Sequence, residues 1–231
     1  MTDTYLITGA NRGIGLELAR SVVTAGGRLI AVCRQPAKAV ELNALCEQSK
    51  GAAVIYAADA CDATALQRIA EQELGSIDVV VCNAGVMNAY GGVEDTDNTA
   101  ESISQVLMTN MAGPFFTARA FLPHLKASPR PRIAIISSYM GSQHHQGTNA
   151  YFYRASKAGA NNLMVTLSIE LRSDGIVVTS FHPGWVRTDM GGADAPLDID
   201  SSCKGMVQQV SAAVGQAGLR YQDFEGNPLP W

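Results

Sequence analysis

Thr8-Gly9-Ala10-Asn11-Arg12-Gly13-Ile14-Gly15 links a short apolar run, residues 4–8, to an amphipathic stretch, residues 14–25. The run has the length of a β-strand and the stretch has apolar residues at helical spacing, so we expect a strand, a turn and a helix. Glycine lets the backbone turn sharply and lets a pyrophosphate approach the amide groups at the helix N-terminus. A tight turn without a ligand would use glycine too, but the position after a first strand favours a dinucleotide-binding turn.

The rest of the chain repeats this alternation of short apolar runs and longer helical patterns. We expect further strands at 28–33, 52–57, 78–82, 132–137 and 176–181, and a short last strand at 221–224. Helices are expected at 37–48, 64–74, 100–125 (interrupted by Gly113-Pro114), 149–173, and from Asp198. The run Asp78-Val79-Val80-Val81-Cys82 is nearly all apolar, as parallel strands covered on both faces require. The pattern predicts one α/β domain over residues 1–231, a doubly wound parallel sheet (Rossmann-type) of about seven strands with helices on both faces.

The composition limits the classes of partner. The chain has 231 residues, 47% of them hydrophobic, and a formal net charge of −4. That charge argues against a nucleic acid or an anionic membrane as a partner. Because neither a signal peptide nor a run of membrane-spanning length is recognisable, we expect a cytoplasmic protein. The cysteines lack the close pairs of a zinc site, so we expect reduced thiols and no metal. They are Cys33, Cys46, Cys61, Cys82 and Cys203.

A tyrosine and a lysine share one face of the predicted helix 149–173. They belong to Tyr153-Arg154-Ala155-Ser156-Lys157, and side chains four residues apart are neighbours on a helix. An ammonium beside a phenol favours the phenolate, so we expect Lys157 to lower the pKa of Tyr153 towards working pH. Alone, such a pair is an ordinary feature of a helix surface.

Further motifs follow the other predicted strands in order. They are Cys82-Asn83-Ala84-Gly85, Ile135-Ile136-Ser137-Ser138-Tyr139-Met140-Gly141 and His182-Pro183-Gly184-Trp185-Val186-Arg187-Thr188-Asp189-Met190. Together with the T-G-x-x-x-G-x-G turn and the tyrosine–lysine pair, they resemble the short-chain dehydrogenase/reductase family over essentially the whole chain. Cys82 departs from the family's N-N-A-G motif. Residues 9–17 and Gly226-Asn227-Pro228-Leu229-Pro230-Trp231 resemble the C-factor-like and Sniffer-like carbonyl reductase branch.

The resemblance implies a catalytic set of Asn110, Ser138, Tyr153 and Lys157. Tyr153 would be the acid–base residue, and Lys157 would bind the cofactor's ribose. The second serine of its pair carries the family match, so Ser138 is preferred to Ser137 as the donor to the substrate oxygen. Asn110 would hold a water in a proton relay, although an asparagine within a helix can also be a polar core residue.

The resemblance also implies the cofactor-binding residues. Asp59 would contact the adenine, and Thr188 would contact the nicotinamide amide. The full set is Gly9, Asn11, Arg12, Gly13, Ile14, Gly15, Arg34, Asp59, Asn83, Ala84, Gly85, Tyr153, Lys157, Pro183, Gly184, Val186 and Thr188. Arg187 and Asp189 are expected to be surface residues of the same loop.

The residues after the second strand indicate which cofactor is preferred. NAD-binding turns place an acid about 20 residues beyond the glycine loop. Here Arg34 follows the strand, and no Asp or Glu occurs between Glu17 and Glu41. An arginine offers planar donors that match a phosphate, and Arg12 could reach the same group. We therefore expect NADP(H) to be preferred, with NAD(H) possible, although Arg34 could instead simply begin a solvated loop.

The predicted function is NADPH-dependent hydride transfer between the nicotinamide and a small-molecule carbonyl or alcohol, as in carbonyl reductases. The alternative is a dinucleotide-binding regulatory or signalling protein of the C-factor type, which would not need all four catalytic residues. We expect the substrate site to lie in the loops after the strands, including residues 185–203. His144 and His145 are expected to be solvated loop residues or substrate contacts.

A homodimer or homotetramer is also expected. The resemblance implies that helices 100–125 and 149–173 pair across a two-fold axis, and closed symmetric assemblies are common. Both helices carry apolar residues beyond one narrow stripe, although these could instead simply cover the sheet. They are Phe115, Phe116, Phe121, Leu163, Val165 and Leu167.

Overall fold

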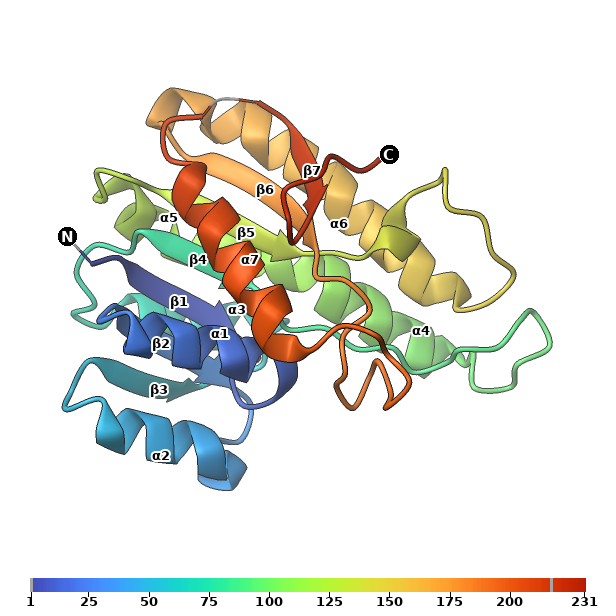
Figure 1. Cartoon of the computed structure of the whole chain (residues 1–231), viewed down its shortest axis with the longest axis horizontal. Coiled ribbons are helices and arrows are strands. Elements are labelled where there is room, and N and C mark those ends of the chain that lie inside the picture. Colours follow the sequence, from blue (N-terminus) through green and yellow to red (C-terminus); the bar gives the residue numbers. More distant parts are fainter. Residues whose placement is uncertain (1, 217) are drawn as a thin grey trace.

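A computed structural model describes residues 2–216 and 218–231; Met1 and Ala217 lie outside the described residues. Its strands form one seven-stranded sheet in the order β3-β2-β1-β4-β5-β6-β7 (Figure 1), and every neighbouring pair is parallel. The strands are β1 Thr4–Thr8, β2 Arg28–Cys33, β3 Ala53–Ala57, β4 Val79–Cys82, β5 Arg132–Ile136, β6 Val177–His182 and β7 Arg220–Asp223. The predicted doubly wound fold is confirmed.

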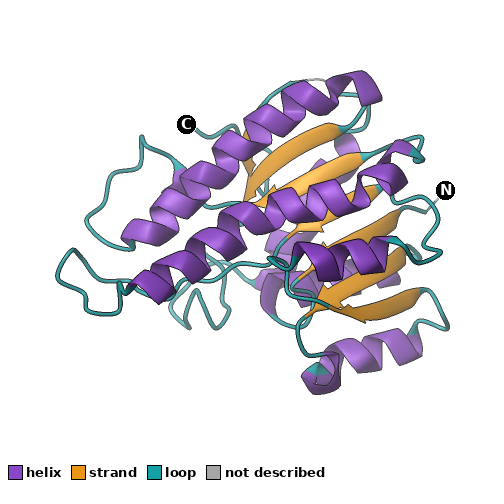
Figure 2. Ribbon diagram, turned by 180° about the vertical axis from the view of Figure 1, so that it is seen from behind, coloured by secondary structure: helices purple, strands orange, loops and turns teal. Residues whose placement is uncertain are grey.

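Helices cover both faces of this sheet (Figure 2). One face packs against α3 Ala63–Ala70, α5 Gly113–Lys126 and α6 Tyr151–Glu170, with α4 Ala100–Leu107 beside α6, and the other against α1 Gly13–Thr24, α2 Val40–Gln48 and α7 Ile199–Ala212. Single turns complete the elements: η1 Pro36–Lys38, the π-helical η2 Met108–Ala112, η3 Tyr139–Gly141 and η4 Leu171–Asp174. No helix among residues 2–216 and 218–231 combines the length and apolar character that a bilayer span requires.

Two cores lie on opposite sides of the sheet because side chains alternate along each strand. In β4, Val80 and Cys82 point towards α5 and α6, whereas Val79 and Val81 point towards α1 and α7. Both sets are almost completely buried. The near-continuous apolar run at 78–82 thus reflects burial on both faces.

The helical region 100–125 differs from the sequence prediction. Gly113-Pro114 does not end it: α4, the turn Met108–Ala112 and α5 follow one another without a break, and Pro114 lies near the start of α5. The irregularity lies just before, in the π-helical turn Met108–Ala112. Such turns often occur at functional sites, and this one contains Asn110.

The helix expected at 64–74 is shorter than predicted and ends at Ala70. Its last apolar residue, Leu74, is instead buried through a turn, and the Leu74 carbonyl accepts a hydrogen bond from Arg28. A periodic pattern cannot distinguish burial by a helix from burial by the turn that follows it.

Candidate active site

The glycine loop between β1 and α1 is closed by contacts that tolerate no side chain. Gly9 and Gly13 have φ values of +66° and +53°, a region that favours glycine. A Cβ at Gly15 would lie 2.3 Å from the carbonyl oxygen of Gly9 and 2.4 Å from Nδ2 of Asn83. The loop therefore requires glycine for its conformation and for its contact with the segment after β4.

The start of α1 fits an anionic group. Its N-cap residue, Arg12, has extended backbone and provides no side-chain cap, and the first turn contains no acidic residue. The first N–H groups of a helix have no partner within the helix, so they can donate hydrogen bonds to a pyrophosphate. Asn11 and Arg12 are exposed beside them, and Gly13 and Ile14 are partly exposed.

Thr8, a residue not expected in the site from the sequence, connects this loop to the Asn83-Ala84-Gly85 segment. Its hydroxyl oxygen accepts hydrogen bonds from the backbone N–H groups of Asn83 and Ala84, at 3.1 and 3.3 Å. In return, Nδ2 of Asn83 donates to the carbonyl of Thr8 at 2.9 Å. Thr8 is 1% exposed and lies next to Gly9 in the motif, which is the signal that could have identified it.

Cys82 replaces the first asparagine of the family motif without leaving a gap. Its thiol is buried and lies 3.8 Å from the carbonyl oxygen of Pro114. Burial raises the pKa of this thiol to about 12, so it stays protonated at neutral pH. Cys82 thus links β4 to the start of α5, a structural contact between neutral groups.

Asn110, in the π-helical turn, joins the segment after β4 to α6. Its Oδ1 accepts from the backbone N–H of Val86, and its Nδ2 donates to the Val86 carbonyl, both at 2.8 Å. Nδ2 also donates to Oγ of Ser156 at 3.0 Å. A Cβ at Gly85 would lie 3.4 Å from both Asn110 Oδ1 and Lys157 Nζ, so Gly85 leaves room for these groups to approach each other.

Lys157 is 4% exposed on the inner face of α6. Its ammonium donates to the carbonyl of Ile136 at 2.8 Å and lies 5.5 Å from the ring centroid of Tyr153. Burial lowers the pKa of Lys157 to about 8, so the side chain is still mainly protonated at pH 7. A cation is thus kept in a site that disfavours charge.

Tyr153 is partly exposed, but its hydroxyl lies deep enough that burial raises its pKa above the usual value; a hydrogen bond with Ser138 acts in the opposite direction. The expectation that Lys157 gives Tyr153 a lowered pKa is therefore wrong for this arrangement. Desolvation of the phenolate is the larger effect, and the ammonium of Lys157 is directed to the Ile136 carbonyl. A raised pKa keeps the proton on Tyr153 at neutral pH.

Ser138 stands where the chain leaves the sheet. The last β5–β6 ladder bond joins the N–H of Ser137 to the Phe181 carbonyl, and Oγ of Ser137 donates to the Lys157 carbonyl at 3.3 Å. Ser138 Oγ, in contrast, faces Tyr153 and accepts from the N–H of Met140 at 3.1 Å. The following turn packs tightly on α6, because a Cβ at Gly141 would lie 2.8 Å from a backbone carbon of Lys157.

The loop after β6 carries the remaining residues selected from the sequence. Pro183 and Val186 are buried, and Gly184 has a φ of +89°. Thr188 Oγ1 accepts from the N–H of Gly191 at 3.1 Å. Arg187, although exposed as expected, donates to the carbonyls of Ala195 and Pro196, both at 2.9 Å, and so braces the loop.

The residues expected around the adenosine part of a cofactor follow β2 and β3. Arg34 is exposed directly after β2. Asp59 Oδ1 accepts hydrogen bonds from the N–H and the thiol of Cys61, at 3.1 and 3.0 Å. Arg12 makes an ion pair of 2.9 Å with Asp189, which connects the glycine loop to the loop after β6.

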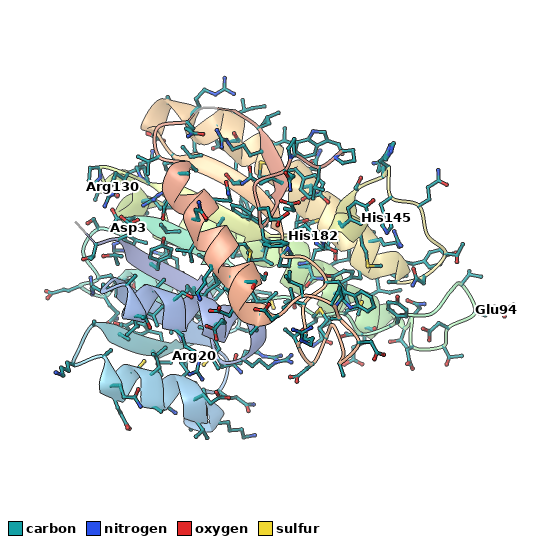
Figure 3. All side chains as sticks on the ribbon, in the orientation of Figure 1. Asp3, Arg20, Glu94, Arg130, His145 and His182 are labelled. Atoms are coloured by element: carbon teal, nitrogen blue, oxygen red, sulfur yellow. The ribbon has the colours of Figure 1, made fainter. Side chains whose placement is uncertain are left out.

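A cluster of aromatic side chains, Tyr139, His145 and His182, lies beside Ser138. The rings of Tyr139 and His145 are 4.0 Å apart, and Tyr139 lies 5.8 Å from His182, the residue before the P-G turn. Figure 3 shows His145 and His182 on the carboxyl-end side of the sheet. Burial lowers the pKa of His182 to about 4, so it is neutral. His144 is exposed, as the solvated alternative predicts.

Together these features define a class of protein: a doubly wound dinucleotide-binding fold whose strand ends bring a serine, a tyrosine and a lysine to one place. A family model described as short chain dehydrogenase matches residues 3–196. The chain belongs to this family and is an NAD(P)-dependent oxidoreductase. The family resemblance expected from the sequence is confirmed.

Individual relatives and solved structures are similar to this chain over most of its length. C-signal of Myxococcus xanthus is 35% identical over 158 residues, which cover 68% of this chain and 94% of that protein. The structure of an NADPH-bound carbonyl reductase from chicken fatty liver superposes with a TM-score of 0.91 at 30% identity, covering 100% of this chain and 99% of that one. Carbonyl reductase Sniffer of D. melanogaster superposes with a TM-score of 0.89 at 29% identity, covering 100% of both chains.

Proposed function

We propose that the protein reduces a small-molecule carbonyl with NADPH and that Asn110, Ser138, Tyr153 and Lys157 form its catalytic set. The observation that carries this proposal is the meeting of a protonated tyrosine, a serine hydroxyl and a buried lysine at the carboxyl end of the sheet. Carbonyl reductase structures of the same fold support the substrate class.

The four residues have separable roles in this proposal. A bound dihydronicotinamide supplies the hydride that forms the new C–H bond at the carbonyl carbon. Ser138 donates a hydrogen bond to the carbonyl oxygen as negative charge develops there. Tyr153 transfers its phenolic proton to that oxygen, and the raised pKa of Tyr153 ensures that the proton is present.

Lys157 and Asn110 would act behind this pair. In the proposal, Lys157 binds the ribose, and its positive charge stabilises the phenolate left on Tyr153 after proton transfer. Asn110 is fixed by its two bonds to Val86. It would orient the water through which a proton returns by way of Lys157.

The same proposal assigns the cofactor to the glycine loop and prefers NADPH. The uncapped start of α1 fits a pyrophosphate, and the positive φ angles of Gly9 and Gly13 shape the loop before it. The exposed Arg34 and Arg12 suit a 2′-phosphate. Asp59, the Asn83-Ala84-Gly85 segment, Pro183, Gly184, Val186 and Thr188 would line the rest of the cofactor site.

The test is NADPH consumption by the purified protein, followed with a panel of aldehydes, ketones and quinones. At least one class should be reduced with stoichiometric formation of alcohol or hydroquinone. Binding of NADPH without turnover of any member would instead favour the regulatory alternative. Against that alternative, a sensor of dinucleotides has no need for all four residues of the catalytic set.

We also propose a homodimer or homotetramer, supported by exposed apolar side chains on the α4–α6 side. They are Met108, Met111, Phe115 and Ile169. Of the residues expected to form the interface, Phe121 and Leu167 are in the core instead, because they cover the sheet. Light scattering should give a multiple of 24.4 kDa at micromolar concentration, and a monomer would contradict the assembly.

The proposed location is the cytoplasm. All five cysteines are described and free, and Cys33, Cys82 and Cys203 are buried. Unpaired thiols are typical of a reducing compartment. Cell fractionation that recovered the protein with an exported fraction would contradict this location.

A further inference from the structure

We propose that Tyr221 is a positioning residue for the reaction: its hydroxyl holds the backbone of Ser138, so that the serine side chain faces Tyr153. The proposal rests on the catalytic role of Ser138 given above. Tyr221 lies in β7, 83 positions along the chain from Ser138, and donates to its carbonyl oxygen at 2.6 Å. The bond is buried, and Tyr221 is 2% exposed.

Ser138 needs an anchor because the β-ladder ends one residue earlier. Among the described residues, one backbone group donates to the Ser138 carbonyl, the N–H of Gly141 at 2.8 Å. This bond closes the short turn after Ser138. A single bond within a turn lets the peptide tilt. The Tyr221 hydroxyl approaches from a neighbouring element and fixes the plane of that peptide, and with it the direction of the Ser138 side chain.

The hydroxyl is suited to be a permanent donor. Burial raises the pKa of Tyr221 to about 12, although the amide of Asn161 beside it acts in the opposite direction. The proton therefore stays on Tyr221 at any working pH. Asn161, which is 3% exposed, lies within hydrogen-bond reach of this hydroxyl.

The end of the chain keeps the tyrosine in place. The N–H of Leu229 donates to the Tyr221 carbonyl at 2.8 Å, and the Tyr221 ring lies 5.5 Å from the ring of Trp231. Residues 224–231 therefore fold back over β7 and cover the outer side of the tyrosine. Trp231 thus packs on Tyr221, and Tyr221 in turn holds the peptide of Ser138.

Substitution of Tyr221→Phe removes the hydroxyl and keeps the ring. The Ser138 carbonyl retains the Gly141 donor, so the fold should survive. Because small displacements of reacting groups strongly reduce rates, we expect kcat to fall roughly ten-fold. KM and the Kd of NADPH should stay within about two-fold, because the substituted group touches neither ligand.

The matched control is Tyr5→Phe. Tyr5 is also a buried tyrosine, 6% exposed, but it lies in β1 with its side chain in the core on the other face of the sheet. This variant should lose a similar amount of stability and keep the wild-type kcat. A proportional loss of kcat in both variants would overturn the proposal, because it would show a general effect of a weakened core.

A double-substitution cycle with Ser138→Ala separates this proposal from the proposed function. Tyr221→Phe should slow the wild type but add nothing in the Ser138→Ala background, because its effect passes through that serine. An equal loss in both backgrounds, or an unchanged kcat in Tyr221→Phe alone, would overturn the positioning role. An unchanged kcat in Ser138→Ala alone would overturn the proposed function itself.

Discussion

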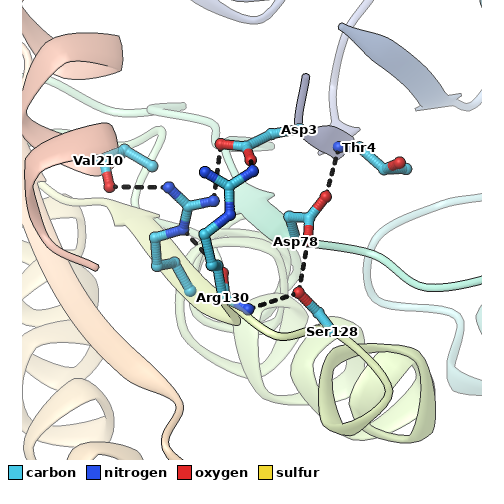
Figure 4. A network of polar contacts seen from close by, with 7 residues as sticks. Asp3, Thr4, Asp78, Ser128, Arg130 and Val210 are labelled. Atoms are coloured by element: carbon cyan, nitrogen blue, oxygen red, sulfur yellow. Dashed lines mark hydrogen bonds and ion pairs between the residues drawn. The ribbon is translucent and has the colours of Figure 1, made fainter. Parts of the chain in front are cut away.

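At the amino ends of the strands, Arg132 is 2% exposed and makes a 2.7 Å ion pair with Asp3, whereas at the carboxyl ends Lys157 is 4% exposed and donates to a backbone carbonyl. The amino-end network is completed by Asp78, which accepts from the Thr4 N–H and from the Ser128 hydroxyl (Figure 4). Within the described residues, no acidic side chain forms an ion pair with Lys157.

The same sheet therefore buries two cations in different ways. At one end the charge is paired with Asp3, whose carboxylate Arg130 shares, and Arg132 links the residue before β1 to β5 and, through the Val210 carbonyl, to α7. At the other end the charge is kept without an anion, and burial lowers the pKa of Lys157 to about 8. Perturbed ionisable groups are typical of functional sites, so the difference separates an end that stabilises the fold from the end proposed to hold the active site.

The largest expected effect is a loss of kcat from a substitution at the carboxyl ends of the strands. Tyr153→Phe removes the proton donor and keeps the ring, so kcat should fall by about 10²–10⁴-fold. NADPH should still bind, which fluorescence titration can measure, and the unfolding free energy should not decrease. A variant with the wild-type kcat would show that the carboxyl end does not use Tyr153 as its acid.

At the amino end, Asp3→Asn should act on stability alone. It leaves the guanidinium of Arg132 buried without its carboxylate, and breaking such a pair costs about 3 kcal/mol in unfolding free energy. Urea unfolding measures this loss. The kcat per folded molecule should equal that of the wild type; a lower value would mean that the two ends are coupled.

Cofactor selectivity should respond to Arg34→Asp. A charge-assisted contact contributes about 1.5–3 kcal/mol, which corresponds to roughly one to two powers of ten in kcat/KM. The wild type should favour NADPH over NADH by at least that margin, and the variant should lose or reverse the preference. Equal use of both cofactors by the wild type would remove Arg34 from the site.

The smallest effect is expected for Asp189→Asn, which repeats the chemical change of Asp3→Asn at an exposed pair. Arg12 and Asp189 have side-chain exposures of 59% and 80%. Solvent screens such a pair, so the unfolding free energy should change by less than about 1 kcal/mol. NADPH should bind slightly more tightly because Arg12 is released towards the 2′-phosphate. Weaker binding of NADPH would indicate that the Arg12–Asp189 pair organises the site.

The sequence was sufficient for most of the sheet because strands β1 to β6 are short, mainly apolar runs with their own boundaries, whereas β7 is polar apart from Tyr221. The glycine loop and the Tyr153–Lys157 pair could be located in the same way, since their residues are close together in the chain. Boundaries that depend on tertiary packing were less accurate: α3 ends at Ala70, and the helical irregularity falls in Met108–Ala112 rather than at Gly113-Pro114.

Contacts between distant residues could not be inferred from local patterns. The bond of Tyr221 to Ser138 spans 83 positions, and no spacing in the sequence indicates it. The direction of the Tyr153 pKa shift also depended on the burial of its hydroxyl, which the helical spacing of Tyr153 and Lys157 does not reveal.

The stability of Lys157→Met relative to the wild type tests the contrast between the two ends most directly. Because the Lys157 pKa is about 8 in the folded protein and 10.5 in a free lysine, the unfolded chain binds the proton more tightly. The protonated lysine therefore destabilises the fold, by at most about 3 kcal/mol below pH 8, and this penalty vanishes as the pH rises to 10.5.

Methionine leaves the Ile136 carbonyl without its donor, which costs about 1 kcal/mol, so urea unfolding at pH 7 should show the variant to be about 1–2 kcal/mol more stable than the wild type. Its advantage should shrink towards pH 10, and its turnover should be lost. A variant less stable than the wild type at pH 7 would contradict the account, because Lys157 would then be a stabilising cation like Arg132.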